Sequence, residues 1–283
     1  MSAAPADIGA LRGAIGRTQQ VHDVVSERLV SEFLATFDQT PEPVAAGTPA
    51  PLGIHWCLGP AIVPAAALCA DGHPAHGAFL PPLPFPRRMW ASSQVTFHDA
   101  LLIGDRMERT SVIRDIALKD GRSGPLCFVS LEHTTSTARG PALTELQDIV
   151  FRPAQGGAPT APAQICTDIA TWQRPMRVDT AMLFRYSAIS FNAHRIHYDR
   201  PYAVDVEGYP GLIVHGPIQA TLLFEFATSI RGQPPARFAL RGEHPLFDFE
   251  AFELCARETG DGALELWVRS SDQIRTMRAT ASW

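Results

Sequence analysis

The sequence predicts an α+β protein made of two similar units packed side by side. In each half of the 283-residue chain, a segment with helical spacing of apolar residues precedes several β-rich segments. Between the halves lies a stretch at residues 152–163 with three prolines and two glycines, a composition typical of a linker. We therefore expect units at residues 21–151 and 164–283, with residues 1–20 as a frayed N-terminus.

The first unit begins with apolar residues at helical spacing across residues 21–37, which predicts an amphipathic helix. Residues 41–92 are rich in proline and glycine, and the prolines between positions 81 and 86 predict an irregular excursion. Residues 94–102, 107–118 and 126–135 are rich in strand-forming residues, with a turn at 120–125. This pattern indicates an antiparallel meander.

The second unit repeats this order. A short apolar stretch at 180–187 leads into a histidine-rich loop, and residues 217–230 are almost wholly apolar, which predicts a buried helix. Strands are expected at 236–241, 248–258, 263–270 and 275–283, with Gly260-Asp261-Gly262 forming a hairpin turn. Because no sequence repeat is visible, the duplication follows from pattern alone.

Composition excludes several classes of function. The net charge of −5 and the lack of a basic stripe argue against a nucleic-acid-binding protein. The longest apolar run, at 61–70, is broken by Pro64, so no membrane span is expected, and no secretory pattern is present. The five scattered cysteines have no C-x-x-C spacing and indicate free thiols in a reducing cytoplasm.

Chemistry concentrates between Tyr186 and Gly216. His194 and His197 lie three residues apart, and His215-Gly216-Pro217 leads directly into the second predicted helix. Adding water to a conjugated thioester needs a base, an acid, and donors for the thioester oxygen as it becomes an enolate. Histidine serves the first two roles near neutral pH, and the N–H of a glycine at a helix start serves the third. Pro217 is well suited to the first helical position.

Residues 188–197 (AISFNAHRIH) and 213–216 (IVHG) resemble the hydratase motif of MaoC-like (R)-specific enoyl-CoA hydratases. That motif reads A-x-S-x-D-x-N-P-x-H, followed later by I-[AV]-H-G. The resemblance implies a double hot-dog fold, with a degenerate N-terminal unit and a catalytic C-terminal unit. The variant string is similar to a branch containing type-two 3-hydroxyacyl-thioester dehydratases and the hydratases of mesaconyl-C4-CoA and itaconyl-CoA.

Carried over residue by residue, the resemblance makes His197 the catalytic histidine and Gly216 the donor to the thioester oxygen. Asn192 stands where the family has a catalytic aspartate. Because an amide cannot act as a base, Asn192 is expected to hold the water while His197 moves the proton. His194 and Arg195 replace the usual asparagine and proline, and a share of His194 in the proton transfer stays open.

The expected substrate-binding residues are His194, Arg195, His215 and Arg241. Arg195 and Arg241 could hold the CoA phosphates or a substrate carboxylate, with simple surface solvation as the alternative. His215 is expected to pack beside the site. No third ligand stands at a zinc-like spacing from His194 and His197, so we expect neither a metal nor a cofactor. Phe85, Met89 and Trp90 belong either to a covering loop or to the wall of an acyl tunnel.

The leading functional hypothesis is a hydratase/dehydratase of a C5 dicarboxyl-CoA such as mesaconyl-C4-CoA or itaconyl-CoA. The same chemistry on linear 3-hydroxyacyl thioesters of fatty-acid or polyketide metabolism is the nearest alternative. A hot-dog thioesterase and a non-catalytic acyl-CoA binder are further alternatives. The expected partner is the acyl-CoA substrate, and association into a homo-oligomer stays open.

Overall fold

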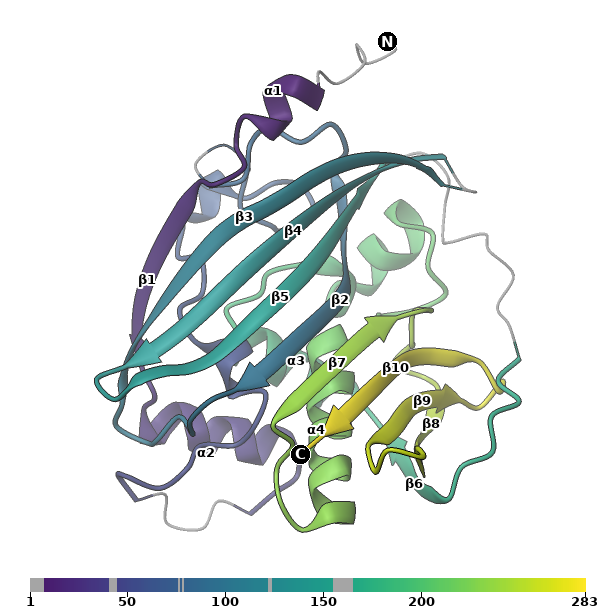
Figure 1. Cartoon of the computed structure of the whole chain (residues 1–283). Coiled ribbons are helices and arrows are strands. Elements are labelled where there is room, and N and C mark those ends of the chain that lie inside the picture. The colour runs from purple at the N-terminus through teal and green to yellow at the C-terminus, as the bar shows by residue number, and fades with distance from the viewer. Residues whose placement is uncertain (1–7, 41–44, 76, 78, 122–123, 155–164) are drawn as a thin grey trace.

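A single ten-stranded antiparallel sheet forms the frame of the protein, in the order β1-β3-β4-β5-β2-β7-β10-β9-β8-β6 (Figure 1). The computed structural model describes residues 8–40, 45–75, 77, 79–121, 124–154 and 165–283. The strands are β1 (Thr18–Val24), β2 (Arg87–Phe97), β3 (Arg106–Gly121), β4 (Gly124–Thr137), β5 (Gly140–Arg152), β6 (Trp172–Arg177), β7 (Arg237–Gly242), β8 (Ala251–Glu258), β9 (Leu264–Ser270) and β10 (Arg275–Ser282).

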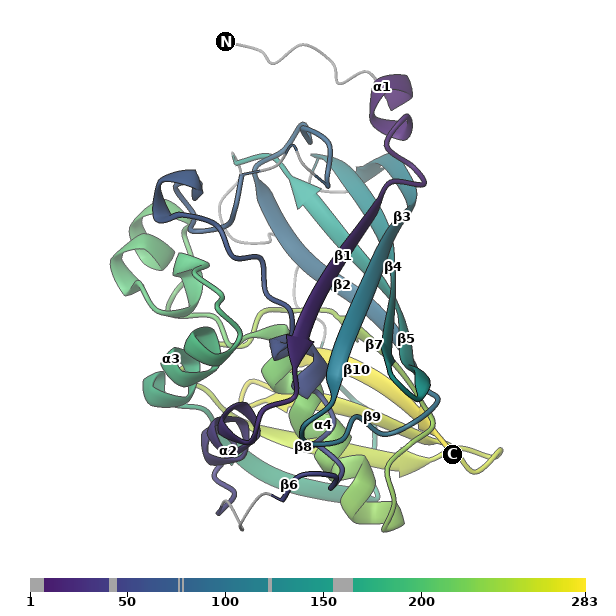
Figure 2. The same cartoon turned by 90° about the vertical axis from the view of Figure 1, so that its left-hand side faces the viewer.

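Four α-helices accompany the sheet in the described part of the chain, and in Figure 2 α2, α3 and α4 lie on one side of it. Their bounds are α1 (Ile8–Arg12), α2 (Glu27–Thr36), α3 (Thr180–Ile189) and α4 (Gly216–Arg231). Short helical turns occur at Ile54–Cys57, Ala65–Ala67, Arg195–His197 and Tyr202–Val206. Among the described residues, no helix has both the length and the apolar character needed to cross a membrane.

The two halves of the chain meet at the pairing of β2 with β7. These strands are antiparallel, with register from Ser92↔Arg241 to Thr96↔Arg237. The backbone hydrogen bonds of the sheet therefore run without a break from one half to the other. The halves share one sheet and one core and are not merely packed side by side.

The N-terminal part of the chain corrects one prediction. Residues 8–20, expected to be frayed, contain α1 and the start of β1, and β1 pairs along β3 from Thr18↔Val112. Residues 1–7 lie outside the described residues. Because the chain is in strand β1 as far as Val24, the helix expected from residue 21 begins only at Glu27. Ser26 caps it by accepting a hydrogen bond from the backbone N–H of Leu29 at 3.1 Å.

Besides β1, two strands were missing from the sequence prediction. β5 directly follows β4, and its last residue is the first of the expected linker, most of which lies outside the described residues. β6 contains Pro175, which cannot donate to a ladder, and β6 is the outermost strand of the sheet, where a proline is tolerated. The strands expected in both meanders otherwise occur with small shifts at their ends, except that the strand expected at 94–102 is β2 at Arg87–Phe97.

Helix α4 is the centre of the main core, as its apolar sequence predicted. It packs against β7, β8, β9 and β10, and its buried residues include Ile218, Leu223 and Phe226. Phe224 contacts Phe238 of β7 at 4.1 Å and stacks on Trp56 of the first half at 5.6 Å between ring centroids. Burial of each such side chain contributes about 1.5–3 kcal/mol to the stability of the fold. The contacts of α4 therefore join both halves of the chain in one core.

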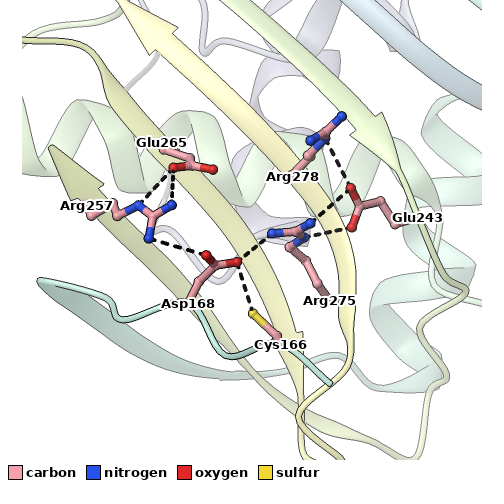
Figure 3. Close-up of polar contacts among 7 residues, drawn as sticks. All are labelled: Cys166, Asp168, Glu243, Arg257, Glu265, Arg275 and Arg278. Carbon is pink, nitrogen blue, oxygen red and sulfur yellow. Dashed lines mark hydrogen bonds and ion pairs between the residues drawn. The ribbon is translucent and has the colours of Figure 1, made fainter. Parts of the chain in front are cut away.

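A network of ion pairs joins the strands of the second half to the segment that precedes them (Figure 3). Asp168 pairs with Arg257 at 3.3 Å and with Arg275 at 2.6 Å. Arg257 also pairs with Glu265, its cross-strand neighbour, at 2.7 Å. Glu243 pairs with Arg275 on β10. The side chains of these groups are about one-third exposed, and ion pairs with such exposure contribute little to stability. We therefore assign them a role in aligning the strands.

Candidate active site

The histidine-rich loop begins where α3 ends. Asp179 caps the start of α3 by accepting a hydrogen bond from Met182 N–H at 2.8 Å. At the other end Phe191 adopts the left-handed conformation, with φ of 51°. This turns the chain sharply, and Asn192 N–H then donates to the carbonyl of Ser187 at 2.8 Å. The residues after Asn192 are thereby brought back beside α3.

His197 is held as a neutral base. Its Nδ1 lies 2.7 Å from the carbonyl oxygen of Ile213, and since a carbonyl only accepts, Nδ1 carries the proton and Nε2 has a free lone pair. Burial, the largest cause, lowers the pKa of His197 to about 4; the hydrogen bond to Ile213 opposes this shift and His73 adds to it. Ile213 N–H also donates to the carbonyl of Ile196 at 3.0 Å, which ties the two loops together. The unprotonated Nε2 can accept a proton from water.

Gly216 opens α4 and offers a backbone donor. No described residue accepts a hydrogen bond from its N–H, and the N-cap residue His215 makes no side-chain cap bond. A Cβ at position 216 would lie 2.7 Å from Cε3 of Trp90. The indole approaches so closely that only glycine fits there. The N–H thus combines with the positive end of a 16-residue helix to form a site for an oxyanion.

Trp90 is fixed in place by a buried chain of hydrogen bonds. Its Nε1–H donates to Ser93 Oγ at 2.9 Å, and Ser93 donates to Glu145 Oε1 at 2.5 Å. Trp56 Nε1–H also donates to Glu145, at 3.2 Å. Burial raises the pKa of Glu145 above its ordinary value, against the effect of these donors. The wall over Gly216 is therefore built by β2 and β5 of the first half.

His215 connects the two parts of the site. Its ring stacks on that of His197 with 3.7 Å between centroids and 17° between planes. Its Nε2 lies 2.9 Å from the hydroxyl of Ser187 on α3. Burial lowers the pKa of His215 well below its ordinary value, so the ring is neutral. His215 packs against His197 and so places the His197 ring next to the start of α4.

Asn192 and Arg195 have other contacts. Asn192 Oδ1 accepts a hydrogen bond from the backbone N–H of His194 at 3.1 Å, so a role in holding water would fall to its NH2 group. Arg195 donates to Asp199 Oδ2 at 2.8 Å and to the carbonyl of Ala70 at 3.0 Å, and its guanidinium lies over the Tyr202 ring. Three N–H groups of Arg195 are therefore used by Asp199 and Ala70.

Arg241 is not brought to the site. It lies on β7 with its side chain exposed, while Phe238 and Leu240 of the same strand are buried. Alternate residues of a strand face opposite sides, so Arg241 projects away from the core and from His197. Arg241 is thus a poor candidate for binding the reacting end of a substrate.

The proposed tunnel residues separate in the structure. Phe85 packs against a second cluster that includes Ile113 and Phe151, and Met89 is 41% exposed. Trp90 alone lies against Gly216. Only one of the three therefore borders Gly216.

Asp71 and His73, which the sequence analysis did not select, lie beside the histidine-rich loop. The rings of His73 and His194 are 4.1 Å apart between centroids. Asp71, His73 and His194 can each offer a ligand atom, and these atoms lie within 4.8 Å of one another. Sequence spacing could not reveal this cluster, because its members come from different halves of the chain. The expectation of no metal stays a prediction.

Comparisons with known proteins fit this geometry. Residues 53–248 match the family model described as hydroxyacyl-thioester dehydratase type 2. The chain is 41% identical to the mesaconyl-C(4)-CoA hydratase of Chloroflexus aurantiacus over 94% of this chain and 95% of that protein. Among solved structures it is similar to a MaoC-like dehydratase, with a TM-score of 0.72 and 16% identity over 96% of this chain and 99% of the other. It is also similar to a Mycobacterium tuberculosis protein described as having a double hot-dog fold, with a TM-score of 0.60 and 14% identity over 95% and 96% of the two chains.

Proposed function

Because the chain belongs to the hydroxyacyl-thioester dehydratase type 2 family and is a hydro-lyase of CoA thioesters, we propose that its substrate is a C5 dicarboxyl-CoA. Mesaconyl-C4-CoA is the first candidate, since a relative named for that activity aligns with nearly the whole chain. Itaconyl-CoA, an isomeric acyl group with the same free carboxylate, is the second.

The proposed reaction follows from two groups. His197 Nε2 takes a proton from water as the water oxygen bonds to the β-carbon of the thioester. The electrons of the double bond move toward the thioester oxygen, which receives the N–H of Gly216 and the positive end of α4. Protonation of the α-carbon then completes the addition, and dehydration runs through the same steps in reverse.

One observation carries this assignment: the ring that stacks on His197 at 3.7 Å belongs to the residue directly before Gly216. A neutral base and an open backbone donor are thus held side by side. A base beside an oxyanion donor would also suit a thioesterase. The family match and the mesaconyl-C(4)-CoA hydratase relative favour addition of water to the double bond.

Arg88 is our candidate for binding the free carboxylate of the substrate. No ion pair of Arg88 occurs among the described residues, whereas Arg195 is already paired with Asp199. Burial lowers the pKa of the Arg88 guanidinium and the charge of Asp71 opposes that shift, which places Arg88 in the neighbourhood of the histidine cluster. A buried guanidinium is stabilised when a carboxylate binds to it.

The test compares hydration rates on mesaconyl-C4-CoA, itaconyl-CoA and crotonyl-CoA with the purified protein. We expect either dicarboxyl-CoA to exceed crotonyl-CoA in kcat/KM by at least about 10²-fold, the discrimination that a lost buried ion pair can give. Equal rates on crotonyl-CoA would refute the dicarboxylate proposal and favour linear 3-hydroxyacyl thioesters. Release of free CoA without a 3-hydroxyacyl product would indicate a thioesterase.

Arg88→Met separates the binding of the carboxylate from the chemistry. We expect it to raise KM for the dicarboxyl-CoA and not to raise KM for crotonyl-CoA, which has no free carboxylate. Arg241→Met, on the outer face of β7, is the matched control and should alter neither substrate's rate.

A further inference from the structure

The segment at residues 69–75 carries a carboxylate–histidine pair. Asp71 Oδ2 accepts a hydrogen bond from Nδ1 of His73 at 2.9 Å, and Asp71 Oδ1 accepts one from the backbone N–H of His73 at 3.0 Å. His73 is 8% exposed. Both oxygens of the carboxylate thus fix the position of one imidazole, and its tautomer follows, because a carboxylate requires a proton on Nδ1.

This segment is bound tightly to the catalytic loop. The backbone N–H of Arg195 donates to the carbonyl of Asp71 at 2.8 Å. Gly72 has φ of +92°, and a Cβ there would lie 1.7 Å from the carbonyl oxygen of Ala193. A glycine between Asp71 and His73 is therefore a condition for the two loops to touch. The guanidinium of Arg195 adds a bond to the Ala70 carbonyl at 3.0 Å.

A line of imidazole rings then leads from Asp71 to the base. The His73 and His194 rings are 4.1 Å apart, and the His194 and His197 rings are 5.3 Å apart and perpendicular. His194 is 8% exposed. The titratable and charged groups that face it are His73, His197, Arg88 and His215.

Hydration needs an acid as well as a base, and a second imidazole beside His197 can supply that acid while His197 takes the proton of water. His197 is neutral and accepts a proton, and Asn192 has none to exchange. Burial, followed by the charges of His73 and His197, lowers the pKa of His194 well below its ordinary value. With these neighbours in place His194 is neutral, and a neutral imidazole is a far weaker acid than an imidazolium. A negative charge close to the pair is needed to keep a proton on it.

We propose that Asp71 and His73 are positioning residues that hold a proton on the His73–His194 pair, so that His194 can protonate the α-carbon of the substrate. His197 takes the proton of the attacking water, His194 gives its proton to the α-carbon, and the electron pair of the double bond forms the new C–H bond. His197 then releases its proton to solvent and the pair takes one up. The inference rests on the proposed hydration reaction.

A metal ion is the competing occupant of this cluster, and two observations oppose it. The two carboxylate oxygens of Asp71 are already engaged by His73. The guanidinium of Arg88 acts electrostatically on both Asp71 and His194, and a nearby cation disfavours a second one. A zinc ion bound through the carboxylate of Asp71 would compete with these hydrogen bonds.

The experiment compares Asp71→Asn and His73→Asn with wild type in kcat, KM and pH profile. The amide introduced at position 71 can still accept the backbone N–H of His73, and the amide introduced at position 73 can still donate toward Asp71. In Asp71→Asn the acceptor of the His73 Nδ1–H is lost, while the backbone bond between the two loops is kept. We expect kcat near pH 7 to fall about 10–100-fold, part of the about 10²–10⁴-fold that a positioned acid contributes, with KM nearly unchanged. Exposed Asp205→Asn controls for the loss of one negative charge.

The pH profile distinguishes this role from a structural one. Asp71 raises the pKa of the protonated pair, so its loss moves the alkaline limb of kcat to lower pH, by about one unit or more. The double variant should lose no more than the worse single variant, because the two residues act as one unit. A uniform fall of kcat at every pH, or additive losses, would overturn the proposal.

Histidine titration by NMR gives a readout that does not depend on turnover. In Asp71→Asn, the imidazole signal assigned to His73 should titrate at lower pH than in wild type, whether or not the chain hydrates any of the three substrates. An unchanged titration would overturn the proposal, while a shifted titration without hydration would count against the proposed function only. A stoichiometric zinc ion whose removal abolishes activity would equally overturn it.

Discussion

Substituting Gly216 by alanine tests the oxyanion site most directly. The new Cβ would lie 2.7 Å from Cε3 and 3.3 Å from Cζ3 of Trp90, well inside the about 3.5–4.0 Å of a favourable carbon–carbon contact. The indole cannot easily retreat, because its N–H is bonded to Ser93 and Ser93 to the buried Glu145. The start of α4 must therefore shift instead, and with it the N–H that receives the thioester oxygen.

The expected losses of stability and of kcat in Gly216→Ala follow from the close contact with Trp90 and from the displaced N–H. Overpacking at one methyl costs about 1–3 kcal/mol of stability. Displacing one backbone donor from a developing oxyanion costs about 10²–10³-fold in kcat, or about 3–4 kcal/mol of transition-state stabilisation. We therefore expect Gly216→Ala to fold, to melt a few degrees lower, and to lose at least about 100-fold in kcat with a small change in KM.

The assay is hydration of the best dicarboxyl-CoA substrate, followed at the absorbance of the conjugated thioester, with thermal melting alongside. Gly260→Ala is the matched control, since nothing lies within 4 Å of a Cβ at that position. Trp90→Leu in the Gly216→Ala background should recover part of the lost kcat by giving the methyl group space. If Gly216→Ala behaves like Gly260→Ala in both kcat and melting temperature, the close packing and the donor role are both refuted.

Three further changes follow from the same structure. His197→Gln should lower kcat by about 10²–10⁴-fold while retaining CoA-thioester affinity in calorimetry, and near-wild-type turnover would exclude His197 as the base. Gly72→Ala should reproduce the Asp71→Asn defect, because its methyl would collide with Ala193 at 1.7 Å; unchanged kcat would separate the loop from catalysis. Burial, the first cause in each case, lowers the pKa of His55 to about 3 and of His197 to about 4, so below pH 6.5 the unfolded chain binds more protons than the folded one. As the pH is lowered from 6.5 to the folded-state pKa of each histidine, the free energy of unfolding should fall by about 1.4 kcal/mol per pH unit for that histidine. Equal urea midpoints at pH 7 and pH 5 would contradict this prediction.

Local pattern predicted much of the fold. The apolar run at 217–230 became α4 at Gly216–Arg231, and the expected hairpins of the second half became β8, β9 and β10. The double hot-dog fold expected from the hydratase motif is confirmed by the likeness to solved structures. β6 and the pairing of β2 with β7 were not predicted. An edge strand needs no alternation strong enough to be seen in sequence, and pairing between distant strands leaves no local pattern.

In the candidate site too, some residues could be predicted from local sequence and others could not. His197 and Gly216 could be selected from sequence, because their chemistry depends on residue type and on the start of a helix that the apolar pattern locates. Arg195 was selected because it lies inside the motif, and Arg241 because it lies near that segment. Neither reason says anything about the direction of a side chain. The structure pairs the first with Asp199 and points the second away from the core.

The sequence by itself determined the histidine-rich loop, the glycine at the helix start and the type of reaction they suit. Each of these depends on residues that lie within about two helical turns of one another along the chain. Only the tertiary structure decided what surrounds them. Asp71 and His73 approach His194 from more than a hundred residues away, and Trp90 covers Gly216 from the other half of the sheet. Such contacts form when the shared core closes, and a carboxylate in a proline- and glycine-rich loop gives no sign of them beforehand.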